Sequence, residues 1–319
     1  MYKAFYGFRE DPFGIAPDPR LFFLTEHLKK ILDSLVQEIT ERKRFILITG
    51  RMGAGKTTLI HELMVRLNSK IRAIPIYQPC KTFDELLGRV LRELKLSVEK
   101  ETKGSMLSQL NEYLLQRSAQ DETLLIIVDE AQALSQEVLE ELRLLCNSDL
   151  RKPRLLQEVF LGEPEIQHKL NTKELRQLQQ RIEGRCQLQP FSESESRRYI
   201  EHRISRVGRS SFDVFTPKAI DVICRYGQGN PRIINRLSYV ALSAGYALSK
   251  RKIDAPVVKQ VCSIFGRQKT STRQRVESSI DAVIDCFESS PLSMRISYAL
   301  LAYSLLQWVV FRFLILEGT

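Results

Sequence analysis

A glycine-rich octapeptide at residues 50–57 limits the possible folds of this 319-residue chain more than any other stretch. It reads Gly50-Arg51-Met52-Gly53-Ala54-Gly55-Lys56-Thr57, continues with Thr58, and fits the pattern G-x-x-x-x-G-K-[ST]. A short apolar run precedes it and a helical stretch follows it, which is the context that such a loop requires. Its glycines let backbone N–H groups turn toward phosphates, and the new helix directs its positive end at them. The octapeptide and Thr58 are therefore expected to bind a nucleotide, with a chance glycine-rich turn as the alternative.

Two side chains of this loop have separate expected roles. Lys56 is expected to reach the β- and γ-phosphates of ATP, and the hydroxyl of Thr57 is expected to ligate Mg²⁺. ATP and Mg²⁺ are therefore the expected cofactors.

A second motif consists of two acids after an apolar run. Residues 124–128 are Leu, Leu, Ile, Ile and Val, and Asp129 and Glu130 follow. Acids delivered by a buried parallel strand lie at its carboxyl end, where ligands bind in open α/β sheets. Asp129 is expected to hold Mg²⁺ through its water shell, and Glu130 to orient and deprotonate the attacking water. Solvent-facing strand ends also carry acids, but the pairing with the phosphate loop predicts an ATPase.

Strand and helix signals alternate along the first 190 residues. Strands are expected at 45–49, near 72–77, at 124–128 and near 155–161, with helices between them, and this alternation predicts an α/β fold whose parallel sheet is covered by helices on both faces. From about residue 191 only helical stretches appear, near 193–207, 217–226, 231–248 and 256–265. The predicted division is an N-terminal arm (1–24), an α/β ATPase domain (25–190), an all-helical lid domain (191–266), a basic polar linker (267–294) and a transmembrane helix (295–316).

Charge is distributed unevenly between the two halves of the chain. Residues 1–150 hold 21 basic and 22 acidic residues, whereas residues 151–319 hold 27 and 16. The basic half is compatible with nucleic acid, with the anionic inner leaflet of a membrane, or with an Arg-rich solvated surface.

The six cysteines form no Cys-x-x-Cys pair, and the N-terminus lacks the apolar core of a signal peptide, so a reducing, cytoplasmic location is expected for the bulk of the chain.

Residues 296–316 are mostly apolar and long enough, as a helix, to cross the roughly 30 Å hydrocarbon layer. The residues before them are basic, so the positive-inside rule predicts a single-pass protein of the bacterial inner membrane with its ATPase domain in the cytoplasm. A helix packed on the ATPase, or an interfacial helix, is the alternative.

Several short motifs together resemble one branch of the AAA+ ATPases. They are Asp129-Glu130-Ala131-Gln132, Phe5-Tyr6-Gly7-Phe8 with the prolines after it, and the segments 161–165, 178–182 and 229–232. Over about residues 1–265 the chain is similar to the general secretion pathway protein A family of type II secretion ATPases. Related members serve pilus and polysaccharide systems, and distant ones are transposition helpers. The resemblance implies an AAA+ P-loop fold and a homo-oligomer with nucleotide at the subunit interface.

The resemblance also implies roles for two arginines. Arg181 corresponds to an arginine finger that acts on ATP in a neighbouring subunit, with Arg185 as its nearest competitor. Arg232 corresponds to the sensor-2 arginine, which contacts nucleotide within its own subunit. In an Arg-rich half of the chain, either can instead be a surface or ion-pair residue. Where the family usually has Gly-Gln-Pro, this sequence has Glu163 in place of the glutamine. An amide can donate a hydrogen bond to a phosphate and an ionised carboxylate cannot, so either Glu163 points away or hydrolysis is slow.

Three functions follow as hypotheses. The first is a membrane-tethered ATPase that energises or assembles an envelope export system, with an export-machine protein and the inner membrane as partners. The second is a DNA-acting ATPase of the transposition-helper type, with nucleic acid as partner. The third is a nucleotide-dependent scaffold with weak hydrolysis, which Glu163 makes possible.

Overall fold

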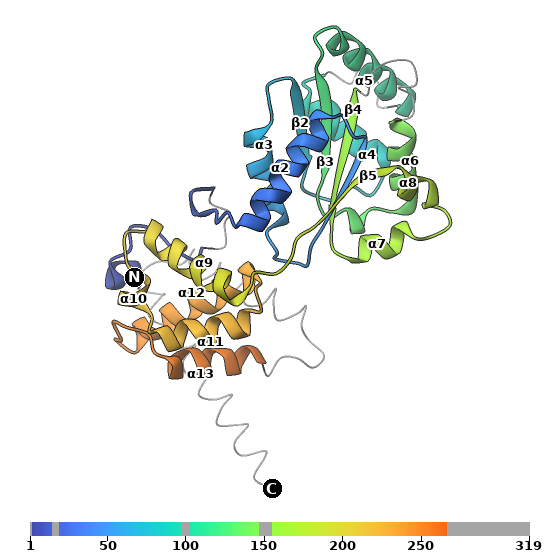
Figure 1. Ribbon diagram of the computed structural model, residues 1–319. Coiled ribbons are helices and arrows are strands. Elements are labelled where there is room, and N and C mark those ends of the chain that lie inside the picture. Colours follow the sequence, from blue (N-terminus) through green and yellow to red (C-terminus); the bar gives the residue numbers. More distant parts are fainter. Residues whose placement is uncertain (1, 15–18, 97–101, 147–154, 267–319) are drawn as a thin grey trace. The chain divides into compact units, whose positions relative to one another are not determined.

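The computed structural model describes residues 2–14, 19–96, 102–146 and 155–266 (Figure 1). Met1–Lys259 forms one compact unit, and the chain from Gln260 onward belongs to a second. In chain order the helices and strands are α1 (Tyr2–Tyr6), η1 (Pro19–Leu21), α2 (Glu26–Thr40), β1 (Phe45–Thr49), α3 (Lys56–Arg66), β2 (Ile71–Ile76), α4 (Phe83–Glu93), α5 (Lys103–Ser118), β3 (Thr123–Val128), η2 (Ala131–Ala133), α6 (Gln136–Leu145), β4 (Leu156–Gly162), α7 (Glu165–Leu170), α8 (Arg176–Arg181), β5 (Ile182–Gln187), α9 (Glu193–Arg206), α10 (Ser211–Val214), α11 (Pro217–Gly227), α12 (Pro231–Ala247) and α13 (Ala255–Gly266), where η marks a 3₁₀ helix.

The five strands form one parallel sheet in the order β2-β3-β4-β1-β5. The register pairs Thr49 at the end of β1 with Gly162 at the end of β4, and Val128 at the end of β3 with Phe160 of β4. The segments that follow β1, β3 and β4 therefore leave the sheet at the same edge. This sheet confirms the predicted α/β fold and brings the two sequence motifs together.

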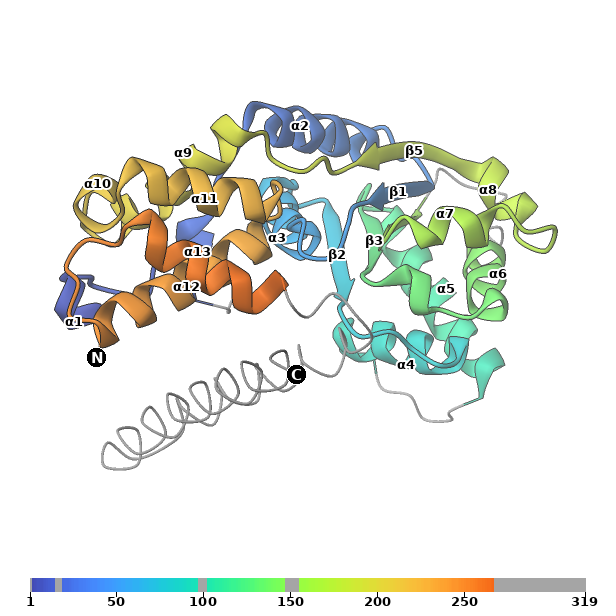
Figure 2. The same cartoon turned by 90° about the horizontal axis from the view of Figure 1, so that it is seen from below.

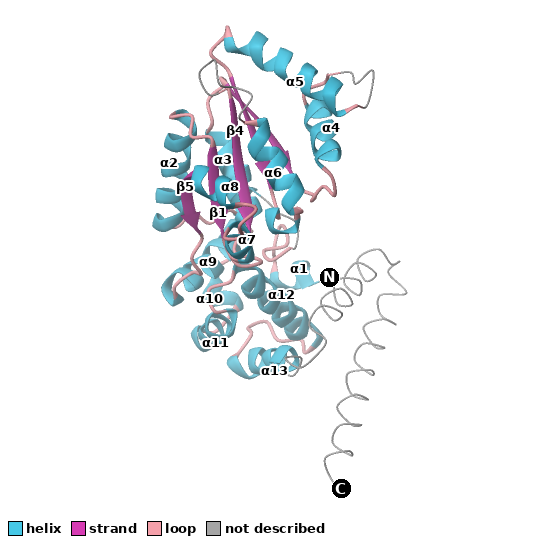
Figure 3. Cartoon of the chain, turned by 90° about the vertical axis from the view of Figure 1, so that its right-hand side faces the viewer, coloured by secondary structure: helices cyan, strands magenta, loops and turns pink. Residues whose placement is uncertain are grey.

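Helices cover both faces of the sheet, as the continuously apolar strands predict. Successive residues of a strand point to opposite faces, so Ile46 and Ile48 pack with the buried side chains of α2 and α3, whereas Phe45 and Leu47 pack with those of α4 to α8. Figure 3 shows α2 beside one face and α4 with α6 beside the other. All five residues of β1 are buried, which gives the segment after β1 a rigid base.

The edge strand β5 and the helices α7 and α8 before it are elements that the sequence did not predict. In β5 the side chains of Glu183, Arg185 and Gln187 are exposed, because alternate residues point to opposite faces of the sheet and one face is open to solvent at this edge strand. Half of its residues are therefore polar, and the strand lacks the apolar run that identifies β1 and β3.

The region after β5 contains the four long helices that the sequence predicts there, and short α10 lies between two of them. In Figure 2 the chain can be followed from β5 into α9. Ser192 and Glu195 form a capping box at the start of α9, and Asn230 caps α12 ahead of Pro231 at its first position. These caps explain why the helices begin where they do.

The N-terminal arm packs on the helical region through contacts far apart in sequence. Tyr6 Oη donates a hydrogen bond to Lys250 O at 3.0 Å, Arg209 Nε donates to Tyr6 O at 2.9 Å, and Phe13 is buried. Burial raises the pKa of Tyr6 to about 12. The arm is less extended than its prolines suggest, because α1 ends before the first of them and η1 begins at Pro19.

In the part of the chain that the structure describes, no helix is both long and apolar enough to cross a bilayer. The longest of these helices, α12, has 17 residues and so spans about 25 Å, short of the roughly 30 Å hydrocarbon layer. This finding contradicts the predicted localisation as a single-pass inner-membrane protein, which is withdrawn. The predicted linker 267–294 and segment 295–316 lie outside the described residues.

Glu158, in the middle of the sheet, makes stability depend on pH. Its side chain is fully buried and accepts a hydrogen bond from Cys146 Sγ at 3.5 Å, while Oε2 has no hydrogen-bond partner among the residues that the structure describes. Burial raises the pKa of Glu158 well above its ordinary value of 4.5, against a smaller lowering by the Cys146 hydrogen bond. The unfolded chain therefore loses this proton at lower pH than the folded chain, and the free energy of unfolding falls as pH rises from 4.5 toward the folded-state pKa.

Glu158→Gln is expected to remove this loss, because the amide is neutral at every pH. Urea unfolding of both chains across pH should show an advantage for Glu158→Gln that is absent below pH 4.5 and grows above it. Glu112→Gln, on the exposed face of α5, is the control. Parallel curves for Glu158→Gln and the wild type would show that Glu158 does not cause this dependence.

Candidate nucleotide site

The glycine-rich loop leaves β1 at the carboxyl edge of the sheet. Gly50 N–H donates a hydrogen bond to Gly162 O at 3.1 Å, and this bond ties the start of the loop to the end of β4. Gly53 and Gly55 have φ of 75° and 93°, in the left-handed region that glycine adopts without strain. The chain then enters α3 at Lys56, so the amino end of that helix faces the turn.

The start of α12 lies against this loop. A Cβ at Gly53 would stand 2.6 Å from Arg232 Cβ and 2.8 Å from Asn230 Oδ1, so only glycine fits there. Asn230 Nδ2 also donates a hydrogen bond to Met52 O at 2.8 Å. Arg232, expected at the site from its sequence context, is thus next to the loop in three dimensions. Asn230 was not predicted as a site residue.

Lys56 is a buried cation with a carbonyl as its hydrogen-bond partner. Its side chain donates to Gly50 O at 3.0 Å, and the residue is 5% exposed. No carboxylate pairs with it among the described residues. A buried ammonium group without a counter-charge is costly, so this position is suited to receive an anion.

The two motifs meet through Thr57 and Asp129. Thr57 Oγ1 donates a hydrogen bond to Asp129 Oδ2 at 2.7 Å, and Asp129 is 4% exposed. The other oxygen of Asp129 accepts from Glu130 N–H at 2.9 Å. A hydroxyl and a carboxylate from different elements thus converge within hydrogen-bond distance beside Lys56.

Glu130 has an unusual backbone conformation. Its φ of 52° and ψ of 39° lie in the left-handed region, which is uncommon for residues other than glycine and costs about 1–3 kcal/mol. Its carboxylate Oε2 accepts a hydrogen bond from Gln132 Nε2 at 2.5 Å. The same amide, through Oε1, accepts from Glu163 N–H at 3.1 Å. Glu163 therefore contributes its backbone to this network.

Arg181 lies away from the loop of its own chain. It directly precedes Ile182, which pairs with Phe45 at the start of β1, whereas the loop begins after the end of β1. At about 3.3 Å per residue this separation is roughly 16 Å along the strand. Arg181 Nη1 is buried and has no hydrogen-bond partner in the described part of the chain, and Arg185 Nη2 donates to Gln179 O at 3.1 Å.

The loop after β2 borders the site at Tyr77. Tyr77 Oη lies 3.4 Å from His61 Nδ1, and the two rings stack at 5.5 Å between centroids. Burial, and after it the negative charge of Asp129, raise the pKa of Tyr77. Neither Tyr77 nor His61 was predicted from the sequence.

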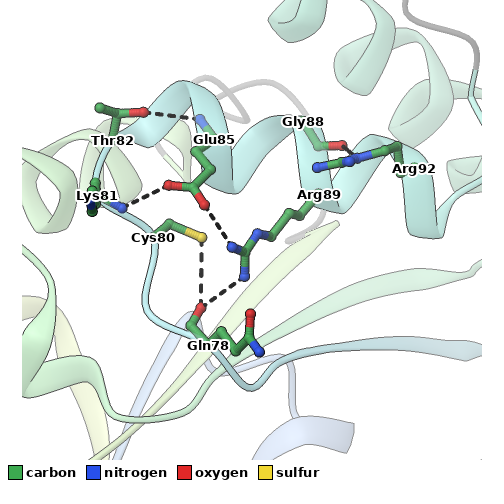
Figure 4. Close-up of polar contacts among 8 residues, drawn as sticks. All are labelled: Gln78, Cys80, Lys81, Thr82, Glu85, Gly88, Arg89 and Arg92. Atoms are coloured by element: carbon green, nitrogen blue, oxygen red, sulfur yellow. Dashed lines mark hydrogen bonds and ion pairs between the residues drawn. The ribbon is translucent and has the colours of Figure 1, made fainter.

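The rest of that loop is fixed by polar contacts with α4 (Figure 4). Arg89 links Gln78 O, at 3.1 Å, to the carboxylate of Glu85, at 2.6 Å. Glu85 also accepts from Lys81 N–H at 2.9 Å, and this bond is the main cause that lowers the pKa of Glu85. These bonds hold the loop beside the sheet edge.

Comparison with known proteins assigns the class. The AAA domain family matches residues 39–170, which include the loop and both acids. The ORC2 protein of Aeropyrum pernix, solved in ADPNP–ADP complexes, shares the fold with a TM-score of 0.61 at 17% identity, over 80% of this chain and 72% of that one. With the sheet order and the two motifs, these findings define an AAA+ P-loop ATPase.

Two proteins of similar sequence give more specific information than the class alone. The chain is 36% identical over 254 residues to general secretion pathway protein A of Aeromonas hydrophila, over 79% of this chain and 46% of the relative. This protein is accordingly an AAA+ ATPase that resembles general secretion pathway protein A in sequence. Over 133 residues it is also 33% identical to the ATP-dependent target DNA activator B of Escherichia phage Mu, 41% of this chain and 40% of that protein. The chain spans less than half the length of either relative.

Proposed function

We propose that the chain binds ATP with Mg²⁺ between the glycine-rich loop and the acids after β3. The main support for this assignment is the buried ammonium group of Lys56, which has no carboxylate partner among the described residues. The β- and γ-phosphates would supply the negative counter-charge. The backbone from Gly50 to Thr58 surrounds the phosphates, with Arg51, Met52 and Ala54 contributing N–H groups rather than side chains.

Thr57 and Asp129 fit a magnesium site. Mg²⁺ keeps several waters and takes few protein ligands, all of them oxygen, and these two side chains offer a hydroxyl and a carboxylate 2.7 Å apart. Thr57 is proposed as a direct ligand and Asp129 as a ligand through water. When bound, Mg²⁺ neutralises charge on the phosphates.

Glu130 is the proposed catalytic base. Its carboxylate orients a water molecule and accepts its proton as the water oxygen attacks the γ-phosphorus, so that ATP and water give ADP and inorganic phosphate. Its place one residue after Asp129, at the edge where the loop lies, supports this role.

The two arginines are proposed to complete the site from different directions. Arg232, beside Gly53, contacts nucleotide from its own helical region, which then acts as a lid. Arg181 is too far along the sheet from its own loop, so its proposed target is the ATP of a neighbouring subunit in a homo-oligomer.

The proposed output is to energise or assemble a bacterial envelope export system, such as a secretin, pilus or polysaccharide machine, through contact with a protein of that machine. The supporting observation is the 36% identity over 254 residues to general secretion pathway protein A. A DNA-acting function is the second candidate, favoured by the 33% identity to the phage Mu target DNA activator and by the basic residues 151–319.

The test replaces Lys56 by alanine in the organism that encodes the chain and measures exported proteins or polymer. Export is expected to fail as it does without the gene, while Lys70→Ala, an exposed lysine paired with Asp121, should be neutral. Normal export in Lys56→Ala cells would refute the export function. The DNA-acting function would then be supported if duplex DNA raised ATP turnover of the purified chain and bound it with steep salt dependence.

A further inference from the structure

Gln132 connects the end of β4 with the carboxylate of Glu130. Its amide oxygen accepts the hydrogen bond from Glu163 N–H, and its amide nitrogen donates to Glu130 Oε2. The preceding residue, Gly162, accepts through its carbonyl from Gly50 N–H at 3.1 Å. One side chain therefore joins the strand end that holds the glycine-rich loop to the residue proposed as the base.

The same network closes on the other side of the site. Glu130 N–H donates to Asp129 Oδ1, and Asp129 Oδ2 accepts from Thr57 Oγ1 in the first turn of α3. A ring of hydrogen bonds thus runs from the loop through β4, Gln132, Glu130 and Asp129 back to the loop. Gln132 contributes its side chain to this ring twice.

The chemistry of its partners determines that residue 132 carries an amide. A peptide N–H can only donate, and an ionised carboxylate can only accept, so a side chain between Glu163 N–H and Glu130 must offer one acceptor and one donor. This requirement also fixes which end of the amide is nitrogen. Glutamate at 132 has the same shape but, when ionised, cannot donate to Glu130.

The space around the amide is adapted to it. A Cβ at Gly162 would lie 3.0 Å from Gln132 Oε1 and 3.1 Å from Ile166 Cγ2, closer than ordinary contact. Lys169 Nζ also donates to Gln132 O at 3.0 Å, which holds the backbone of η2. Backbone and side chain of Gln132 are therefore both fixed, and they hold a carboxylate whose own backbone is strained.

We propose that Gln132 is a positioning residue, which holds one oxygen of Glu130 so that the other faces the attacking water and which couples this orientation to the end of β4. Oε1 of Glu130 has no protein partner within the described ranges, so it is available to water. The proposal rests on the function of Glu130 given above. Gln132 also supplies an amide next to position 163, where this sequence has a glutamate in place of the family's usual glutamine.

The test measures steady-state ATP hydrolysis by the full chain carrying Gln132→Ala or Gln132→Glu. A hydrogen bond to a charged group contributes enough that kcat is expected to fall about 10- to 100-fold. KM for ATP should stay within about twofold, since Gln132 touches none of the proposed nucleotide ligands except through Glu130. Gln136→Ala, whose amide donates to Thr172 Oγ1 at 3.5 Å in the same segment, is the matched control and should keep its kcat.

The Glu130→Gln background separates this role from a structural one. If Gln132 acts through Glu130, adding Gln132→Ala to Glu130→Gln should lower the residual turnover no further. A further loss in that background, or a normal kcat in both single variants, would overturn the proposal. Gln132→Glu keeps the volume and serves if Gln132→Ala does not fold. Undiminished turnover of Glu130→Gln alone would instead refute the role of Glu130.

Discussion

Replacing Glu130 by glutamine is expected to leave ATP bound but almost unhydrolysed. Proton transfer by a positioned base contributes roughly 10²- to 10⁴-fold, so turnover should fall by that amount. Binding should persist, because the proposed phosphate and magnesium contacts come from the loop, Lys56, Thr57 and Asp129. Single-turnover hydrolysis of radiolabelled ATP, with equilibrium binding measured in parallel, distinguishes the two steps.

The comparison with Glu137→Gln makes that result specific. Glu137 is exposed in the first turn of α6, seven residues along the chain, and its replacement should leave turnover intact. Undiminished hydrolysis by Glu130→Gln would remove the assigned base. Turnover near the uncatalysed rate in the wild-type chain would favour the nucleotide-dependent scaffold.

Arg181→Ala is expected to keep ATP affinity but to lose up to about 10³-fold in turnover, as the loss of an arginine finger does. The rate per chain of the wild type should rise with protein concentration, because the proposed site is complete only between subunits. Mixing Arg181→Ala with Glu130→Gln should restore part of the activity, since one interface then carries both intact side chains. Steady-state rates across a concentration series and across mixing ratios measure both effects.

Variants of two further arginines test whether the arginine-finger role belongs to Arg181 alone. Arg185→Ala tests the nearest competitor, and Arg176→Ala, at the exposed start of α8, serves as control. Loss of turnover in Arg185→Ala with normal turnover in Arg181→Ala would transfer the role to Arg185. A rate per chain that is independent of concentration, without rescue in mixtures, would argue for a monomeric enzyme.

The sequence predicts those parts of the fold whose signal is local. β1 and β3 are continuous apolar runs because helices cover both sides of the sheet, and the phosphate loop and the acids lie directly after them. β5 escaped prediction because an edge strand exposes alternate residues. The localisation was wrong because hydropathy of residues 296–316 was the basis for it, and the described helices include none that could cross a membrane.

The site was predicted where chemistry and motif coincide, and missed where it depends on tertiary contacts. Asp129 and Lys56 could be chosen from their motifs alone. Asn230 bonds to Met52, 178 positions away, and Gln132 accepts from Glu163, 31 positions away. Their local sequence does not reveal these hydrogen bonds. Arg232 was anticipated through resemblance, and its contact with Gly53 depends on how α12 packs.

The position of the N-terminal arm has a consequence for the order of folding. Tyr6 leaves the ribosome well before its partner Lys250, which follows 244 residues later in the chain. The sheet is encoded entirely between these two, so it can assemble while the arm is still unpaired. During that interval Tyr6, Phe8 and Phe13, all buried in the finished protein, are exposed apolar side chains. The arm therefore gains its protection from solvent only after the helical region that contains Lys250 has been synthesised.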